Sequence, residues 1–176
     1  MSLKRFAENT DFRHPEVYVV LENYGCAVYV AQLYERGLQN VITGLEQLGA
    51  LTVPPGTTRS GDGFVDSCLG PLLRVFESQT KMDKAMSRVL KKAHYHRNLL
   101  VHRFLAENAV DLLNAAGCAK INQQLERIYN TVCHANAITS QLSEQIFAHL
   151  GFDPDKVKRR IDEMRRIAEE PQIDVD

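Results

Sequence analysis

The stretch from Glu16 to Leu48 reads EVYVVLENYGCAVYVAQLYERGLQNVITGLEQL, and its pattern predicts one long helix. Its apolar side chains recur every three or four residues, which is the spacing of one face of an α-helix. Pro15 suits the first helical position, because the N–H that proline lacks has no partner there. We therefore expect a helix from about residue 15 to about residue 48. The apolar face consists of Val17, Leu21, Tyr24, Val28, Ala31, Leu38, Ile42 and Leu45.

Glycine and proline mark the boundaries of the segments that follow. Residues 51–63 contain two prolines and three glycines and are expected to form an exposed loop. Gly151 is a natural stop for a helix, and Asp153 with Pro154 is a good start for the next one. The further helices that we expect are 64–79 with a break at Gly70-Pro71, 81–105 with a short extension at Leu112 and Leu113 before Gly117, 119–150, and 153–169.

Four main helices with almost no strand signal predict an all-α fold. The simplest packing is an antiparallel four-helix bundle with a short extra C-terminal helix. The chain has 176 residues, which is enough for one core and too few for two comfortable domains. We expect a single helical-bundle domain over residues 1–176, with its core at about 15–150 and a C-terminal helix and tail at 151–176.

The composition excludes several classes of protein. A formal net charge of −1 argues against binding of nucleic acid through the whole surface, so any such contact needs a local patch. No apolar run approaches the roughly 20 residues that cross a bilayer, and the polar start shows no secretory signal. We expect a soluble, cytoplasmic protein without a membrane partner. The widely spaced cysteines Cys26, Cys68, Cys118 and Cys133 predict neither a metal site nor a disulfide framework, and no cofactor is expected.

The helix predicted at 81–105 breaks its own pattern. Leu90, Ala93, Leu100 and Phe104 form an apolar stripe, and Arg97 falls in the middle of it. Burying an unpaired guanidinium costs several kcal/mol, so Arg97 needs a carboxylate, a cavity, an interface or a ligand. Rules broken locally in an otherwise consistent helix are where function is sought first.

Polar residues near Arg97 complete a candidate site. Asn98 lies four residues before His102, and we expect its amide to orient the imidazole. We expect His94 and His96 to face solvent. The surrounding segment is basic, and the residues expected to contact RNA are Lys91, Lys92 and Arg103.

The string from His96 to Phe104, HRNLLVHRF, resembles the signature of HEPN domains (higher eukaryotes and prokaryotes nucleotide-binding). That signature is an Arg, usually followed by a polar residue, and a His after four to six residues. The resemblance spans about residues 16–150, including Leu69-Gly70 before the motif. It implies a four-helix bundle, a homodimer and a metal-independent endoribonuclease of toxin–antitoxin, phage-defence or RNA-processing type, with a cognate antitoxin protein as a further partner. Arg97 and His102 would be the catalytic pair, Asn98 would support them, and the product would carry a 2′,3′-cyclic phosphate.

The chemistry agrees with these residue types. An imidazole can take the proton of a ribose 2′-hydroxyl near neutral pH, and a guanidinium can stabilise the charge that builds on the phosphate. Five residues of helix leave Arg97 and His102 roughly 140° apart, which favours a site built from two copies of the chain.

Two other functions stay open. In the first, the chain is a non-catalytic dimerisation or adaptor module in which Arg97 forms an ion pair at the interface. In the second, the bundle is a sensor that binds a nucleotide or another phosphate ligand at Arg97. The bare pattern does not decide, because Arg88 with His94 and Arg127 with His134 have comparable spacings.

Overall fold

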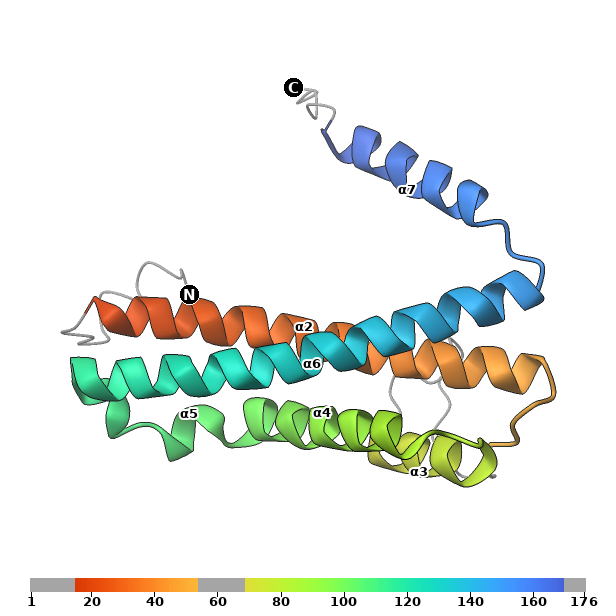
Figure 1. Ribbon diagram of the computed structural model, residues 1–176. Coiled ribbons are helices and arrows are strands. Elements are labelled where there is room, and N and C mark those ends of the chain that lie inside the picture. The colour runs from red at the N-terminus through yellow and green to blue at the C-terminus, as the bar shows by residue number, and fades with distance from the viewer. Residues whose placement is uncertain (1–14, 54–68, 170–176) are drawn as a thin grey trace.

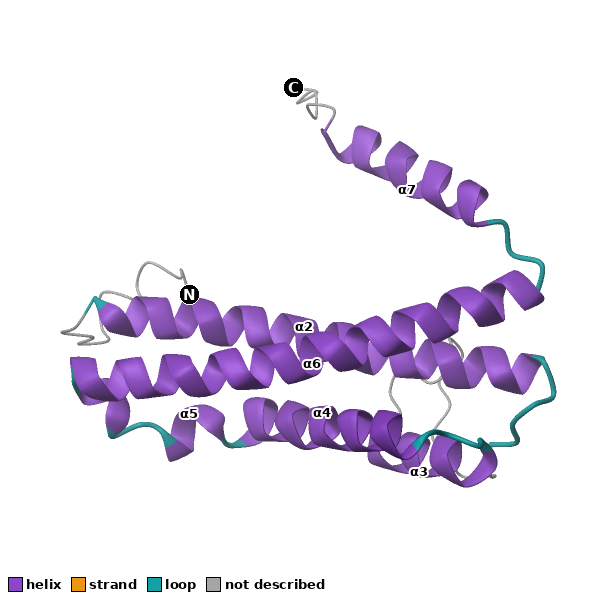
Figure 2. Ribbon diagram, in the orientation of Figure 1, coloured by secondary structure: helices purple, strands orange, loops and turns teal. Residues whose placement is uncertain are grey.

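The protein is all-helical over the residues that its computed structural model describes, 15–53 and 69–169 (Figures 1 and 2). No strand occurs within these residues. The prediction of an all-α fold is therefore confirmed. Most of the loop expected at 51–63, and the start of the helix expected at 64, lie outside the described residues.

Six α-helices and one short 3₁₀ helix make up the described chain. Their bounds, in order, are α2 Glu16–Gln47, α3 Leu69–Gln79, α4 Lys84–His102, α5 Phe104–Glu107, the 3₁₀ helix Asp111–Leu113, α6 Ala115–His149 and α7 Pro154–Glu169.

Most of the predicted helix ends agree with these bounds to within one residue, but the predicted break is absent and three ends differ by three or four residues. α4 begins at Lys84 instead of residue 81, because the side chain of Asp83 caps it. Pro71 does not break α3, because it lies in the first turn, where its missing N–H has no partner to lose. α4 ends at His102 instead of continuing to residue 105, since Arg103 leaves the helical region with φ −139°. α6 begins four residues earlier than expected, because the side chain of Asn114 caps it by accepting the N–H of Gly117 at 2.8 Å.

The two longest helices, α2 and α6, pack side by side along most of their length (Figure 1). Asn23 Nδ2 donates to Asn122 Oδ1 at 2.9 Å near their starts. Further along, a Cβ added to Gly37 would lie 2.5 Å from Thr139 Oγ1, so the missing side chain allows the close approach. The residue numbers of the contacts increase together along both helices, so α2 and α6 run in the same direction.

α4 runs the opposite way and is attached to α2 by two tyrosines. The hydroxyl of Tyr24 donates to the carbonyl oxygen of Leu100 at 2.8 Å, and that of Tyr34 donates to the carbonyl of Leu90 at 2.9 Å. The expected antiparallel packing therefore holds between α4 and α2, but it is wrong for the long pair, α2 and α6. Sequence periodicity identifies which face of a helix is apolar and carries no information on the direction of its neighbour.

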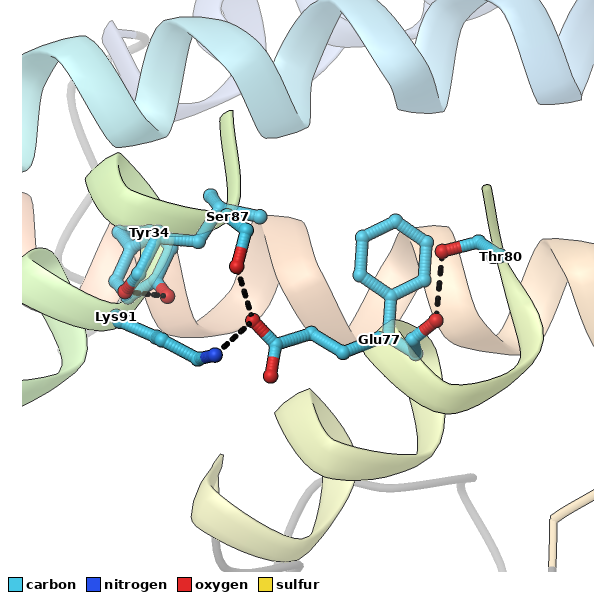
Figure 3. Close-up of polar contacts among 7 residues, drawn as sticks. Tyr34, Glu77, Thr80, Ser87 and Lys91 are labelled. Carbon is cyan, nitrogen blue, oxygen red and sulfur yellow. Dashed lines mark hydrogen bonds and ion pairs between the residues drawn. The ribbon is translucent and has the colours of Figure 1, made fainter. Parts of the chain in front are cut away.

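α3 packs against the first half of α4 through a polar clamp (Figure 3). Glu77 accepts a hydrogen bond from the Ser87 hydroxyl at 2.6 Å and pairs with the Lys91 ammonium at 3.0 Å. At the other end of α3, Gly70 lies against His94. α3 and α4 are thus antiparallel, and α3 is shorter than α2, α4 and α6.

One apolar core lies between α2, α3, α4 and α6. Its largest fully buried side chains include Tyr34, Phe104, Leu38, Ile42, Leu72, Leu90 and Ile121. α7 follows Gly151, whose φ of +79° suits the residue after a helix, and it extends away from this core (Figure 1). None of the helices in the described ranges combines the length and apolar character that crossing a bilayer needs.

Candidate functional site

The guanidinium of Arg97 is tied to a carboxylate of the neighbouring helix. Its Nε donates to Glu35 Oε2 at 3.0 Å, and one terminal nitrogen lies 2.8 Å from the same oxygen. The two side chains are 23% and 18% exposed, so the pair lies at the rim of the core and remains accessible. Of the possibilities predicted for Arg97, which were a carboxylate, a cavity, an interface or a ligand, the structure shows a carboxylate, that of Glu35 on α2.

Asn98 extends this pair into a short polar chain. Its Oδ1 accepts from the other terminal nitrogen of Arg97 at 3.2 Å, and its Nδ2 lies 3.3 Å from Nε2 of His94. The expectation that this amide orients His102 is wrong, because the structure places it against His94, four residues earlier. Arg97 thus donates two hydrogen bonds, and its second terminal nitrogen lies in an ion pair with Glu35. At least one N–H of each terminal nitrogen has no acceptor among the described residues.

His94 and His96 are half-buried, so the prediction that they face solvent is wrong. Desolvation lowers the pKa of both, with Arg97 adding to the effect at His94 and Lys92 at His96. The Nδ1 atom of each ring is buried and has no hydrogen-bond partner in the part of the chain that the structure describes. These rings therefore favour the neutral form.

His102 is the last residue of α4, and it is exposed. Its imidazole makes no hydrogen bond to any described residue, so it is open to a ligand. The helix end that carries it is held firmly, because Tyr24 binds the Leu100 carbonyl and its ring stacks on Phe104 with centroids 5.9 Å apart. Leu100 lies in the last turn, where carbonyl groups lack partners within the helix.

The residues expected to contact RNA differ in how free they are. Lys91 is engaged with Glu77 (Figure 3), and Arg103 lies 3.5 Å from Glu107 in an exposed pair one turn apart. Lys92 is exposed and has no ion-pair partner among the described residues. An exposed pair contributes little, so of these three residues Arg103 and Lys92 are the cations available to an approaching phosphate.

Sequence reasoning missed Glu35 and the role of His94. Glu35 lies 62 residues before Arg97, and no local spacing links them. His94 stands as far before Asn98 as His102 stands after it, so the choice between the two is open to a pattern alone. What identifies Glu35 as the partner is its half-buried position on the side of α2 that faces α4. That position is known only once the packing of the helices is known.

The arrangement offers an oriented guanidinium and, at the end of the same helix, an accessible imidazole. In residues 15–53 and 69–169, no three His, Cys, Asp or Glu side chains gather in a way that could hold a metal ion. Comparisons with protein-family models, with curated proteins and with solved structures find no match to this chain.

Proposed function

We propose that the chain is a HEPN-like, metal-independent endoribonuclease that acts as a homodimer in toxin, phage-defence or RNA-processing systems. Arg97 and His102 are the catalytic pair, and Asn98 supports Arg97. The observation that carries the proposal is the guanidinium of Arg97, which is held in place by Glu35 and Asn98 and keeps N–H groups for a ligand. The HEPN-like motif and the expected four-helix core support it, with α3 as the short fourth helix.

In this proposal, His102 takes the proton of a ribose 2′-hydroxyl. The 2′-oxygen attacks the adjacent phosphorus, and the bond from phosphorus to the 5′-oxygen breaks. The leaving 5′-oxygen takes a proton from the second copy's imidazolium, which leaves a 2′,3′-cyclic phosphate and a 5′-hydroxyl. Arg97 stabilises the negative charge that builds on the phosphate oxygens, where donors fixed in advance act most strongly.

A dimer completes the site. Arg97 faces α2, whereas His102 is exposed at the helix end, so one helix does not aim both groups at one phosphate. A second copy can supply the missing partner, and the exposed cations Lys92 and Arg103 lie on the same helix or just beyond its end. A cognate antitoxin would cover the surface that carries these cations.

One observation favours the non-catalytic alternative. Glu35 already neutralises Arg97, and a guanidinium in an ion pair attracts a phosphate less strongly than a free one. If this pair has only a structural role, the chain is a helical dimerisation or adaptor module. A phosphate-binding sensor is the intermediate case, in which Arg97 binds a nucleotide without turning it over.

Cleavage of a labelled RNA by the purified full-length chain separates these functions. We expect cutting that persists in excess chelator and falls at least a hundredfold in Arg97→Ala and in His102→Ala. His134→Ala is the matched control, because His134 is also exposed but lies on α6, and it should cut like the wild type. Cutting that stops with chelator, or that survives His102→Ala, contradicts the mechanism.

A thermal-shift screen with nucleotides tests the sensor. A ligand that binds only the native state raises Tm, and Arg97→Ala should abolish the rise. A rise without turnover favours the sensor, and no rise with no cleavage favours the module.

A further inference from the structure

One face of α2 is exposed and is not covered by any other described helix. It carries opposite charges at its two ends. We call it the Tyr29 face and define it by Glu22, Gly25, Tyr29, Leu33 and Arg36. These residues are spaced three or four apart, so they share one side of the helix. All five are exposed, and Tyr29 and Leu33 are large apolar groups with 61% and 40% of their surface open.

The charges on this face are arranged symmetrically about Tyr29. Glu22 lies seven residues before it and Arg36 seven residues after it. Seven residues are close to two helical turns, so the two charges and the tyrosine lie along one line. Neither Glu22 nor Arg36 has an ion-pair partner among the described residues.

Gly25 is the second unusual feature of the face. The glycines Gly37 and Gly44 of the same helix lie where a Cβ would strike α6, so packing inside the chain explains them. A Cβ added at Gly25 would meet nothing within 4 Å. An exposed glycine within a helix is unfavourable without compensation, and the space it leaves lets another helix approach closely.

We propose that the Tyr29 face binds the same face of a second copy of this chain, with the two α2 helices antiparallel and a two-fold axis at Tyr29. In such an isologous contact, residue i meets residue j and j meets i. Glu22 of each copy then lies at the level of Arg36 of the other, which makes two ion pairs. Leu33 lies at the level of Gly25, whose missing side chain leaves room between the helices. A parallel arrangement would instead set like charges against each other.

This interface agrees with the proposed function but does not rest on it. A two-fold axis that exchanges antiparallel helices runs perpendicular to the plane of the pair. Groups on one side of that plane in one copy therefore lie on the same side in the other. The two Arg97–Glu35 pairs then share one face of the dimer, as a composite site requires.

Sedimentation equilibrium of the full-length chain tests the interface by charge reversal. We expect a dimer whose dissociation constant rises at least tenfold in Glu22→Arg and in Arg36→Glu. The double variant should return to within threefold of the wild type, because it restores opposite charges across the axis. Glu144→Arg, at an exposed site on α6, is the matched control and should leave the constant unchanged. Circular dichroism and Tm verify that each variant is folded.

Cross-linking gives a readout that is independent of affinity. Tyr29→Cys in a Cys26→Ser background should oxidise to a disulfide-linked dimer, and the Cys26→Ser parent should not. A monomeric wild type, a double charge variant without recovery, or a Tyr29→Cys variant that does not cross-link would each overturn the interface. A dimer of this kind that does not cut RNA supports the interface and rejects only the nuclease. Cutting by a dimer that ignores both charge reversals rejects only the interface.

Discussion

The ion pair between Arg97 and Glu35 makes the most specific prediction about stability. We consider Glu35→Gln and Arg97→Gln, singly and together, since glutamine keeps much of the side chain and removes the charge. Each single change leaves the remaining charge half-buried without its partner. The double change removes both charges, and the coupling between the two sites measures the pair itself.

The exposure of the two side chains sets the size of the effect. Fully exposed pairs contribute about 0–1 kcal/mol, whereas breaking a buried pair costs about 3–5 kcal/mol. At 23% and 18% exposure the pair lies between these limits. We therefore expect each single variant to lose about 1.5–3 kcal/mol of unfolding free energy, with a coupling of about 1–2 kcal/mol.

Urea unfolding followed by circular dichroism measures these free energies. The matched control is the pair of Arg103 with Glu107, whose side chains are 57% and 52% exposed. The same glutamine cycle there should give a coupling below about 0.5 kcal/mol.

Additive effects at Glu35 and Arg97, within about 0.3 kcal/mol, would refute the reasoning. Arg97 would then be free of Glu35 in solution. Its full charge would be available to a phosphate, and the main support for the non-catalytic alternative would disappear.

Three further predictions concern helix packing, pH and capping. Gly37→Ala should lower the free energy of unfolding by about 1–2 kcal/mol, because overpacking against α6 exceeds the gain in helix propensity. Gly25→Ala should raise it by up to about 1 kcal/mol in dilute, monomeric protein. Urea unfolding measures both. The pKa of His94 lies below its usual 6.5, so the unfolded chain takes up the proton first as the pH falls. The contribution of neutral His94 to stability is therefore complete above about pH 6.5 and is lost as the pH falls through the lowered pKa. A pH series of Tm should show a smaller loss of stability on acidification in His94→Gln than in the wild type. Asp83 caps α4 by accepting the backbone N–H of Ala85 at 3.0 Å, and Asp83→Ala should cost about 1 kcal/mol and lower Tm by about 2–4 °C.

The helix ends could be predicted where the sequence marks them with capping residues. Pro15, Gly151 and the Asp153–Pro154 pair stand within two residues of the bounds of α2, α6 and α7. Gly70 and Pro71 suggest a false break, because a proline in the first turn of a helix and one in its interior look alike in a sequence whose helix start is not known.

The direction of the long helices could not be predicted from periodicity. α2 and α6 run in parallel and meet through close contacts, such as Gly37 against the side chain of Thr139. Such a match depends on two residues about a hundred positions apart. An apolar stripe is equally compatible with a neighbour running either way.

At the candidate site, the sequence predicted that the charge of Arg97 needs compensation but did not identify the group that supplies it. An arginine within an apolar stripe requires compensation, and Arg97 has it. That the compensation is Glu35, and that Asn98 contacts His94 rather than His102, depends on how α2 and α4 dock.

The chemical form of the cut RNA ends tests the central proposal most directly. With the wild-type chain and excess chelator, we predict one fragment ending in a 2′,3′-cyclic phosphate and the other beginning with a 5′-hydroxyl. Neither should form with His102→Ala. Fragments that carry a 3′-hydroxyl and a 5′-phosphate, or an RNA that stays intact at every enzyme concentration, would contradict the assignment of Arg97 and His102 as a catalytic pair.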